Sequence, residues 1–160
     1  MVSPAFEGLV VSPGRKQYSF IATRTAGPIP HDLFLQAASS GPARDVTSAI
    51  DRAVLNARWQ NDSTIMILVA DGFRNRILRI DSNGLTVPVD LPDSVRAFDV
   101  VSDGTPIFAG VVGFNRLPEL LIRRIDGTIA QVSHLQQGWE GVQLADAEVF
   151  RFKSFDGTEI

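Results

Sequence analysis

One short turn pattern recurs three times along this chain of 160 residues, and it constrains the fold more than any other feature of the sequence. The three copies are Ser12-Pro13-Gly14-Arg15, Asn61-Asp62-Ser63-Thr64 and Ser102-Asp103-Gly104-Thr105. They lie roughly 40 to 50 residues apart, a period that is typical of repeat architectures. We therefore expect three related structural units rather than one irregular domain.

Each unit is predicted to contain four short strands. One strand precedes the repeated turn, a second follows it directly, a third comes after a loop, and a fourth follows a tight turn. The tight turns are rich in Gly, Asn and Asp, which tolerate the positive φ of a narrow hairpin. Four antiparallel strands per repeat are typical of a β-propeller blade. The predicted fold is all-β: a partial β-propeller of about three four-stranded antiparallel blades. The predicted strands are 7–11, 18–22, 32–37, 53–59, 64–70, 76–81, 95–101, 106–112 and 119–126, with tight turns at 39–41, 82–84 and 126–127 before the last strand of each unit.

The second strand of the middle unit favours the same interpretation. The run Thr-Ile-Met-Ile-Leu-Val-Ala at 64–70 does not alternate polar with apolar residues, so both of its faces must be covered. An inner strand between two neighbouring blades meets that demand. Pro42 and Pro88 flank or interrupt only the last strand of a unit, the outer edge where a missing N–H is tolerated. Helical periodicity is absent except around 136–146, which we interpret as a loop or a single helical turn.

The predicted domain organisation follows these units. Blades are expected at about 1–50, 51–92 and 93–135, and a linker at 136–146 completes the propeller part, 1–146. Residues 147–160 are predicted to form a junction strand that leads towards a further domain. Three blades cannot close a ring, because propellers have four to eight. We therefore expect a fragment whose open ends are covered by blades encoded upstream or by further copies of the chain.

Composition excludes several classes of function. The net charge is −3, with 15 basic and 18 acidic residues, and the basic residues are scattered, so no nucleic-acid partner is expected. The chain has no cysteine, which excludes disulfides and cysteine nucleophiles and fits a cytoplasmic location. The first eleven residues lack the features of a signal peptide, and the longest apolar run, Ile65–Ala70, is too short to cross a bilayer. No membrane partner is expected either.

The C-terminal segment resembles a known junction. Residues Glu148–Ile160, Glu-Val-Phe-Arg-Phe-Lys-Ser-Phe-Asp-Gly-Thr-Glu-Ile, resemble the link between propeller and catalytic domain in prolyl oligopeptidase-family serine peptidases, the acylaminoacyl-peptidase branch above all. Ser12-Pro13 and the other repeat turns are similar to the Ser-Pro-Asp-Gly-Lys blade signature of that family, which other propellers such as the TolB-like repeats share. The resemblance implies a propeller that covers the active-site entrance and admits only short peptides.

Catalytic chemistry is not expected within the chain itself. In the family that it resembles, the α/β-hydrolase domain would begin where this sequence stops. The sequence has no Gly-x-Ser-x-Gly nucleophile elbow and no Gly-rich phosphate loop, so we predict no catalytic residue and no cofactor. His31 and His134 have no ligand partner at metal spacing, so no metal site is predicted. Asp62, Asp103 and Asp156 precede Ser or Gly in turns, where Asp caps its own backbone.

Two loops are the candidate contact sites. Residues 71–76 and 113–116 occupy the same place in successive units, between the second and third strands. Each loop offers a Phe, an Asn and an Arg, which can bind a peptide carboxylate or pack on a hydrolase domain. The competing interpretation is a solvated turn whose arginine covers apolar surface. The candidate residues are Phe73, Arg74, Arg76, Phe114, Asn115 and Arg116, together with Trp139 as a possible contact with the hydrolase domain.

Two functional hypotheses follow. The first is a non-catalytic propeller segment of a serine hydrolase, partnered by an α/β-hydrolase domain or further blades, that gates the active site of the intact peptidase or esterase for short peptides. The second is a stand-alone propeller-repeat module that binds a protein or peptide and forms a homo-oligomer through its open blade ends. A third interpretation, that the chain alone is an enzyme, lacks an activated nucleophile or metal constellation.

Overall fold

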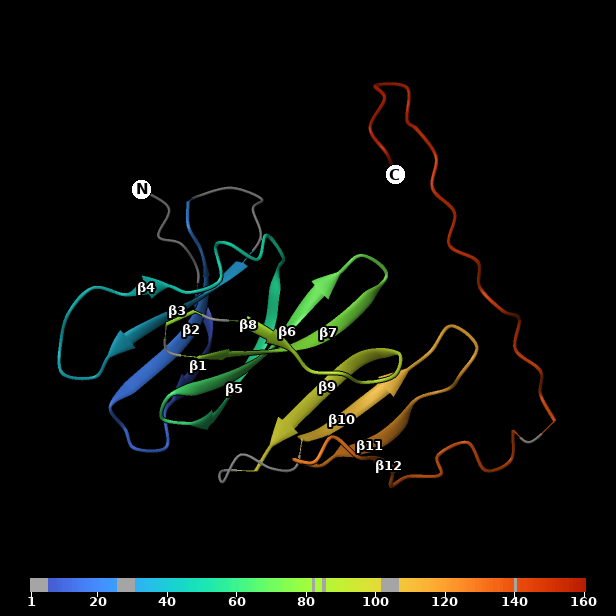
Figure 1. Ribbon diagram of the computed structural model, residues 1–160, viewed down its shortest axis with the longest axis horizontal. Coiled ribbons are helices and arrows are strands. Elements are labelled where there is room, and N and C mark those ends of the chain that lie inside the picture. The colour runs from blue at the N-terminus through green and yellow to red at the C-terminus, as the bar shows by residue number, and fades with distance from the viewer. Residues whose placement is uncertain (1–5, 26–30, 82, 85, 102–106, 140) are drawn as a thin grey trace.

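The computed structural model describes residues 6–25, 31–81, 83–84, 86–101, 107–139 and 141–160. These residues form three four-stranded antiparallel sheets, each with its strands in chain order, and contain no helix (Figure 1). Within them there is accordingly no helix that could cross a membrane. We call the three sheets blades 1, 2 and 3. Blade 1 contains β1 (Phe6–Val11), β2 (Gln17–Thr23), β3 (His31–Ala37) and β4 (Arg44–Asp45); blade 2 contains β5 (Val54–Asn61), β6 (Thr64–Asp71), β7 (Arg74–Asp81) and β8 (Thr86–Pro88); blade 3 contains β9 (Ser94–Val100), β10 (Ile107–Val112), β11 (Glu119–Arg123) and β12 (Ile129–Gln131).

This arrangement confirms the predicted all-β partial propeller. One sheet lies in each of the predicted ranges 1–50, 51–92 and 93–135. The largest difference in a predicted boundary is at β11, which ends at Arg123 rather than at residue 126. Arg124 and Thr128 instead close the turn, where the Gly127 N–H donates to the Arg124 carbonyl at 3.0 Å. The predicted start of β10 at residue 106 falls outside the described residues.

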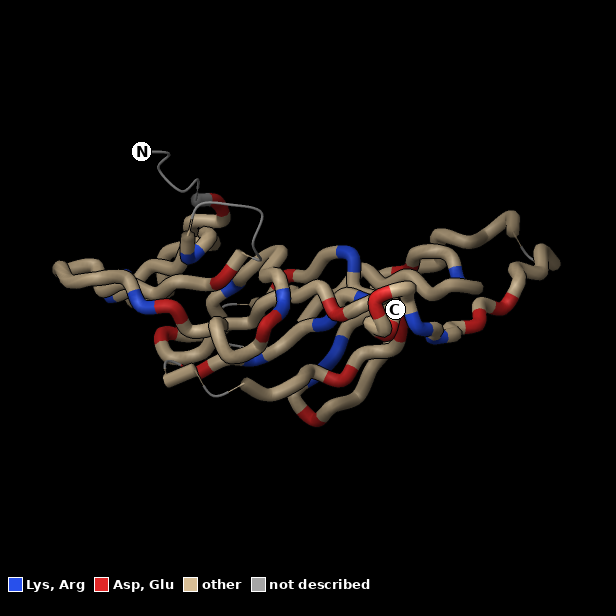
Figure 2. Tube along the Cα trace, turned by 90° about the horizontal axis from the view of Figure 1, so that it is seen from above, with Lys and Arg blue, Asp and Glu red and all other residues tan. Residues whose placement is uncertain are grey.

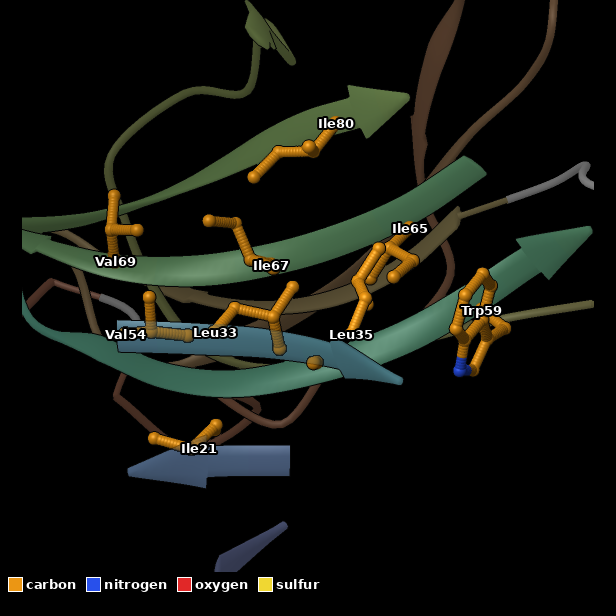
Figure 3. Close-up of a cluster of buried hydrophobic side chains, with 10 residues drawn as sticks. Ile21, Leu33, Leu35, Val54, Trp59, Ile65, Ile67, Val69 and Ile80 are labelled. Atoms are coloured by element: carbon orange, nitrogen blue, oxygen red, sulfur yellow. The ribbon is translucent and has the colours of Figure 1, made fainter. Parts of the chain in front are cut away.

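The first interface between blades holds an aliphatic core. Strand β5 contacts β1, β2 and β3, so the first strand of blade 2 lies against the first three strands of blade 1. Leu33 of blade 1 and Ile67 of blade 2 have no exposed surface in this cluster, and the indole of Trp59 closes one end of it (Figure 3). The Trp59 Nε1–H donates to the Val10 carbonyl at 3.1 Å, because a buried indole N–H needs an acceptor.

A second core of the same kind joins blades 2 and 3. Met66, Leu68 and Ile77 face away from blade 1 and pack against buried Phe98 and Val111 of blade 3. Consecutive residues of β6 therefore enter opposite cores, and five in a row are buried. The structure explains the non-alternating run at 64–70, because this strand is covered on both faces.

The repeated turns of blades 1 and 2 contact each other directly. Asn61 closes its own turn, since its Oδ1 accepts from the Ser63 N–H at 2.9 Å. The expectation that Asp62 also caps its own turn is wrong: its Oδ1 accepts from the Gly14 N–H of blade 1 at 2.5 Å. A Cβ at Gly14 would lie 2.1 Å from Asp62 Oδ2, so a side chain there would displace the carboxylate. Asp156 does cap its own turn, through the Thr158 N–H at 2.9 Å, and Asp103 lies outside the described residues.

The C-terminal segment leaves the sheets and runs beside them as an extended chain (Figure 1). The junction strand predicted at 147–160 is instead a narrow hairpin, closed by an isolated antiparallel bridge between Lys153 and Glu159. No blade strand pairs with this segment among the described residues, and a strand is stable only when it has a hydrogen-bonded neighbour. Phe150 and Phe155 are 76% and 103% exposed, so the segment presents apolar side chains that nothing described here covers.

The first core gives a prediction about stability. Ile67→Ala is expected to lower the free energy of unfolding by about 2–5 kcal/mol, because the substitution leaves a cavity between two rigid sheets. Ile125→Ala is the matched control, since Ile125 is 80% exposed and its truncation should change stability by less than about 0.5 kcal/mol. Urea unfolding followed by the fluorescence of Trp59 measures both variants. Equal effects of the two substitutions would contradict the assigned blade interface.

Candidate functional site

A groove of about 340 Å³ lies where the candidate loops of blades 2 and 3 meet. Phe73 and Arg74 line it from the β6–β7 connection, and Phe114 lines it from the loop after β10. The predicted loops therefore do share one end of the blades. The remaining lining comes from residues on either side of these loops and from the start of β9: Gly72, Asn75, Asp93, Ser94, Arg96, Val112 and Gly113.

The β6–β7 connection is a tight hairpin that holds an aromatic ring out in solvent. Asp71 pairs with Arg74, which leaves two residues in the loop. Gly72 has φ +60°, a conformation that glycine adopts at less cost than any residue with a side chain. Phe73 follows it with 73% of its surface exposed. The tight turn therefore holds the apolar side chain of Phe73 in solvent.

Asp93 organises the opposite wall. Its carboxylate pairs with the Arg116 guanidinium at 3.2 Å, and its backbone has φ +61°, which is uncommon for a residue with a side chain. A Cβ at Gly113 would lie only 3.0 Å from Asp93 Oδ1, so a glycine leaves room for the carboxylate. The Gly113 N–H also donates to the Arg116 carbonyl at 3.2 Å. These contacts fix the loop that carries Phe114.

Blades 2 and 3 are joined beneath the groove by a hydrogen bond between side chain and backbone. The Asn75 N–H donates to Ser94 Oγ at 2.9 Å. Because Asn75 follows Arg74 and Ser94 follows Asp93, this bond sets the distance between the two walls. The groove is therefore part of the blade interface and not a gap between independent loops.

Two guanidinium groups in the groove carry uncompensated charge. Among the described residues, neither Arg74 nor Arg96 forms an ion pair with a carboxylate. The one acidic residue in the lining, Asp93, is already paired with Arg116. Two free guanidinium groups between two exposed phenyl rings can bind a carboxylate that carries an apolar neighbour.

The other candidate residues lie elsewhere. Arg76 does not line the groove and shares Asp71 with Arg52, at 3.1 and 3.0 Å respectively, in a small surface network. Asn115 donates through Nδ2 to Asp146 Oδ1 at 2.5 Å and so ties the loop to the segment after blade 3. Arg116 and Trp139 line a second, wider hollow of about 520 Å³.

Glu119 anchors that second hollow. It is only 4% exposed, and its carboxylate accepts from the Ser133 hydroxyl and, at 3.3 Å, from the Leu135 N–H. The Ser133 hydrogen bond is the main cause that lowers the pKa of Glu119 below its ordinary value, and burial opposes it. Gln136 Nε2 donates to the Leu117 carbonyl at 2.6 Å and closes the loop that leads to Trp139. Trp139 itself is 56% exposed.

Sequence reasoning missed three residues of the groove and its surroundings. Asp93, Ser94 and Arg96 lie at the start of β9, in a region that the repeat pattern describes only as the beginning of a strand. The sequence held a weak signal for this region. Asp93 and Ser94 precede an apolar strand, and Asp and Ser in such a place often form hydrogen bonds from the side chain to nearby backbone. That pattern does not show that the serine bonds to the preceding blade.

The pKa of Glu119 gives a prediction about pH. Since its folded pKa lies below the ordinary value of 4.5, Glu119 stabilises the fold above that pH and loses this contribution as the pH falls through the folded pKa. Glu119→Gln should therefore flatten the acid limb of stability against pH below about 4.5. Thermal unfolding between pH 7 and 3 measures this, with Glu148→Gln as an exposed control. An unchanged acid limb in Glu119→Gln would contradict the assignment.

Comparison with known proteins shows a likeness of fold. No family model and no curated protein matches the sequence. Among solved structures, acylaminoacyl peptidase from Pyrococcus horikoshii superposes with a TM-score of 0.77 at 15% identity, over 96% of this chain and 24% of that chain. TolB from Acinetobacter baumannii superposes with a TM-score of 0.63 at 15% identity, over 94% of this chain and 35% of that chain.

A third structure, of a puromycin hydrolase variant, superposes with a TM-score of 0.52 at 11% identity, over 97% of this chain and 32% of that chain. This chain thus spans between about a quarter and a third of the length of these three proteins. At such identities the likeness establishes the fold. The chain has the fold of part of a β-propeller, and two of the proteins with which it aligns over nearly all of its length are a peptidase and a hydrolase.

Proposed function

We propose that the chain is a non-catalytic propeller segment of a serine hydrolase of the prolyl oligopeptidase type, which covers the active site and gates it for short peptides. The observation that carries the proposal is the alignment of 96% of the chain with an acylaminoacyl peptidase of which it spans 24%. That share leaves room in the larger protein for the catalytic domain that this chain lacks. The proposed intact protein is a peptidase or esterase, and its proposed location is the cytoplasm.

The C-terminal hairpin supports an adjoining domain as the partner. Phe150, Phe152 and Phe155 lie on a segment that leaves the blades, and each is more than half exposed. Three exposed phenylalanines within six residues expose apolar surface that is normally buried in a contact. An α/β-hydrolase domain packed on this segment would cover them, and the resemblance of Glu148–Ile160 to the family's junction gives the same expectation.

The groove supports the proposed gate. Phe73 and Phe114 project from rigid turns at one end of the blades, and Arg74 and Arg96 lie between them without ion-pair partners among the described residues. In the proposed protein these side chains line the route to the active site, where the rings limit the size of a peptide and the guanidinium groups attract its carboxylate.

The test begins with the gene. The reading frame around the codons for Met1 and Ile160 should encode further blades and a hydrolase domain with a Gly-x-Ser-x-Gly elbow. The whole encoded protein should react with a serine-directed fluorophosphonate, whereas the isolated 160 residues should not. A frame that encodes no hydrolase domain would contradict the proposal, and so would labelling of the isolated chain.

Gating is tested by a pair of variants of the whole protein. Phe73→Ala combined with Phe114→Ala should raise kcat/KM for long peptides by about tenfold and leave short peptides within about twofold, because only long substrates meet the rings. Ile125→Ala removes an equally exposed apolar side chain at the other end of the blades and should change neither value. An equal effect on long and short peptides would contradict gating at this groove.

The open face of blade 1 favours a second candidate function, a module that assembles with other copies through its blade ends and binds a protein or peptide. The first two strands of blade 1 pair in the same way as the first two strands of blade 2, so equivalent positions can be compared. In blade 2 the equivalent positions are buried against blade 1: Ala57, Trp59, Ile65 and Ile67. In blade 1 they are Leu9, Val11, Tyr18 and Phe20. In blade 1 these positions instead line an uncovered apolar hollow of about 480 Å³. Two copies packed head to tail would provide six blades, within the range that closes a ring.

Solution mass separates the two candidates. A stand-alone module should sediment as one discrete dimer, and Phe20→Asp should convert it into a monomer because a charge cannot be buried in the interface. A propeller segment taken from a larger protein should instead aggregate or remain a poorly ordered monomer. Analytical ultracentrifugation over a hundredfold range of concentration distinguishes a closed dimer from open-ended association.

A further inference from the structure

A second pocket between blades 2 and 3, at the end opposite to the candidate groove, has an unusual concentration of positive charge. It has a volume of about 300 Å³ and is lined by Arg79 of β7 and by Arg123 and Arg124 at the end of β11. We call it the arginine pocket. Its other lining residues are Gln60, Met66, Val87, Pro88, Val89, Ile107 and Ile125.

The arginine pocket is separate from the candidate groove. Strand β7 begins at Arg74, which lines the groove, and reaches Arg79 five residues later, about 16 Å along an extended strand. Strand β10 gives the same order, because it begins at Ile107 in the arginine pocket and ends at Val112 in the groove. The two sites therefore lie at opposite ends of the blades, and neither depends on the function proposed for the other.

None of the described residues that line the arginine pocket is acidic. Among the described residues, none of its three guanidinium groups forms an ion pair with a carboxylate. Arg123 Nε donates to the Asp90 carbonyl at 3.1 Å, which holds the group in place and leaves its terminal nitrogens available. The nearby Asp126 forms no ion pair with these arginines: its Oδ1 accepts from the Thr128 hydroxyl at 2.7 Å and from the Thr128 N–H at 2.9 Å, and these bonds lower the pKa of Asp126 more than the charge of Arg124 does.

Other arginines of this protein are compensated by ion pairs. Acidic and basic residues are interspersed along the chain (Figure 2), and the net charge is −3. Six other arginines form ion pairs with nearby carboxylates. These are Arg24 with Asp32, Arg52 and Arg76 with Asp71, Arg58 with Asp99, Arg116 with Asp93, and Arg151 with Glu159. The arginine pocket therefore brings three guanidinium groups to one place without an ion-paired carboxylate among the described residues, an arrangement that suits an anion from outside the chain.

The floor and rim of the pocket are apolar. Met66 and Ile107 are buried in the second core and close the bottom, while Val87 and Ile125 stand at the rim with 40% and 80% of their surfaces exposed. A ligand that enters the pocket thus meets cationic groups and apolar side chains together. An inorganic ion would contact only the cationic groups, whereas an organic anion would contact the cationic groups and the apolar side chains.

We propose that the arginine pocket binds a phosphate monoester that carries a small apolar group. A phosphate monoester has a charge between −1.5 and −2 at pH 7 and three strong acceptor oxygens, which match several guanidinium groups better than one carboxylate does. Arginine also binds phosphate in a bidentate geometry that a lysine cannot provide. The apolar group lies over Met66 and against Val87 and Ile125.

The test is isothermal titration of the whole encoded protein with phenyl phosphate, inorganic phosphate and benzoate at low ionic strength. Phenyl phosphate should bind most tightly, and benzoate at least about tenfold more weakly, a difference of about 1.4 kcal/mol. Arg79→Gln combined with Arg124→Gln should weaken phenyl phosphate at least about tenfold. Lys16→Gln combined with Lys153→Gln removes the same charge at two exposed positions outside both the candidate groove and the arginine pocket, and should change the affinity less than about twofold.

Each other outcome would overturn the proposal. Equal losses in the two double variants would mean that only net charge attracts the ligand, and equal affinities for benzoate and phenyl phosphate would remove the preference for phosphate. Footprinting with phenylglyoxal tests the site in the unsubstituted chain, should the Arg79 and Arg124 variant fail to fold. Phenyl phosphate should protect Arg79 and Arg124 from modification while leaving the exposed Arg15 of blade 1 reactive, and protection of none or of all three would contradict the assigned pocket.

Discussion

The structure depends on burying both faces of the middle sheet. Strand β6 sends Ile65, Ile67 and Val69 into one core and Met66 and Leu68 into the other, so blade 2 is stable only with a neighbour on each side. Antiparallel sheets can leave one face in water, but a strand with this run of apolar residues cannot. The same constraint applies to the outer blades, whose far faces carry Tyr18 and Phe20 at one end of the set. A propeller ring answers this demand by giving every blade two neighbours.

Face-to-face packing also determines where binding sites can form. The blades meet along their faces, so the connections between strands collect at the two ends of each interface, where chains from adjacent blades lie side by side. The groove around Arg74 occupies one end of the interface between blades 2 and 3, and the pocket around Arg79 occupies the other. Both sites contain side chains fixed by the rigid sheets beneath them. Such placement lowers the entropy lost on binding, because the backbone that carries the contacting residues is already ordered before the ligand binds.

Much of the fold was predictable because its signals are local. Glycine and asparagine at the tight turns, the repeated turn motif and the apolar run of β6 each act within a few residues, and together they fixed the number of strands, their order and the blade spacing. The candidate site was predictable only in part. Phe73, Arg74 and Phe114 were found because they occupy equivalent loop positions, whereas the role of Asp93 depends on a contact with Arg116, 23 residues away (116 minus 93). Asp62 was misassigned for the same reason, since its partner Gly14 belongs to another blade.

The arginines illustrate how far sequence alone can take such an argument. Arg76 and Arg79 lie on the same strand, three residues apart, and nothing in their immediate sequence distinguishes them. The structure places Arg76 beside Asp71, where its charge is compensated, and Arg79 beside two further guanidinium groups, where it is not. Like charges held together without a counterion repel one another, although solvent and salt weaken the repulsion between exposed groups. Guanidinium groups that line one pocket without a carboxylate are better placed to bind an anion than arginines that are already ion-paired, because the anion would compensate all of them at once.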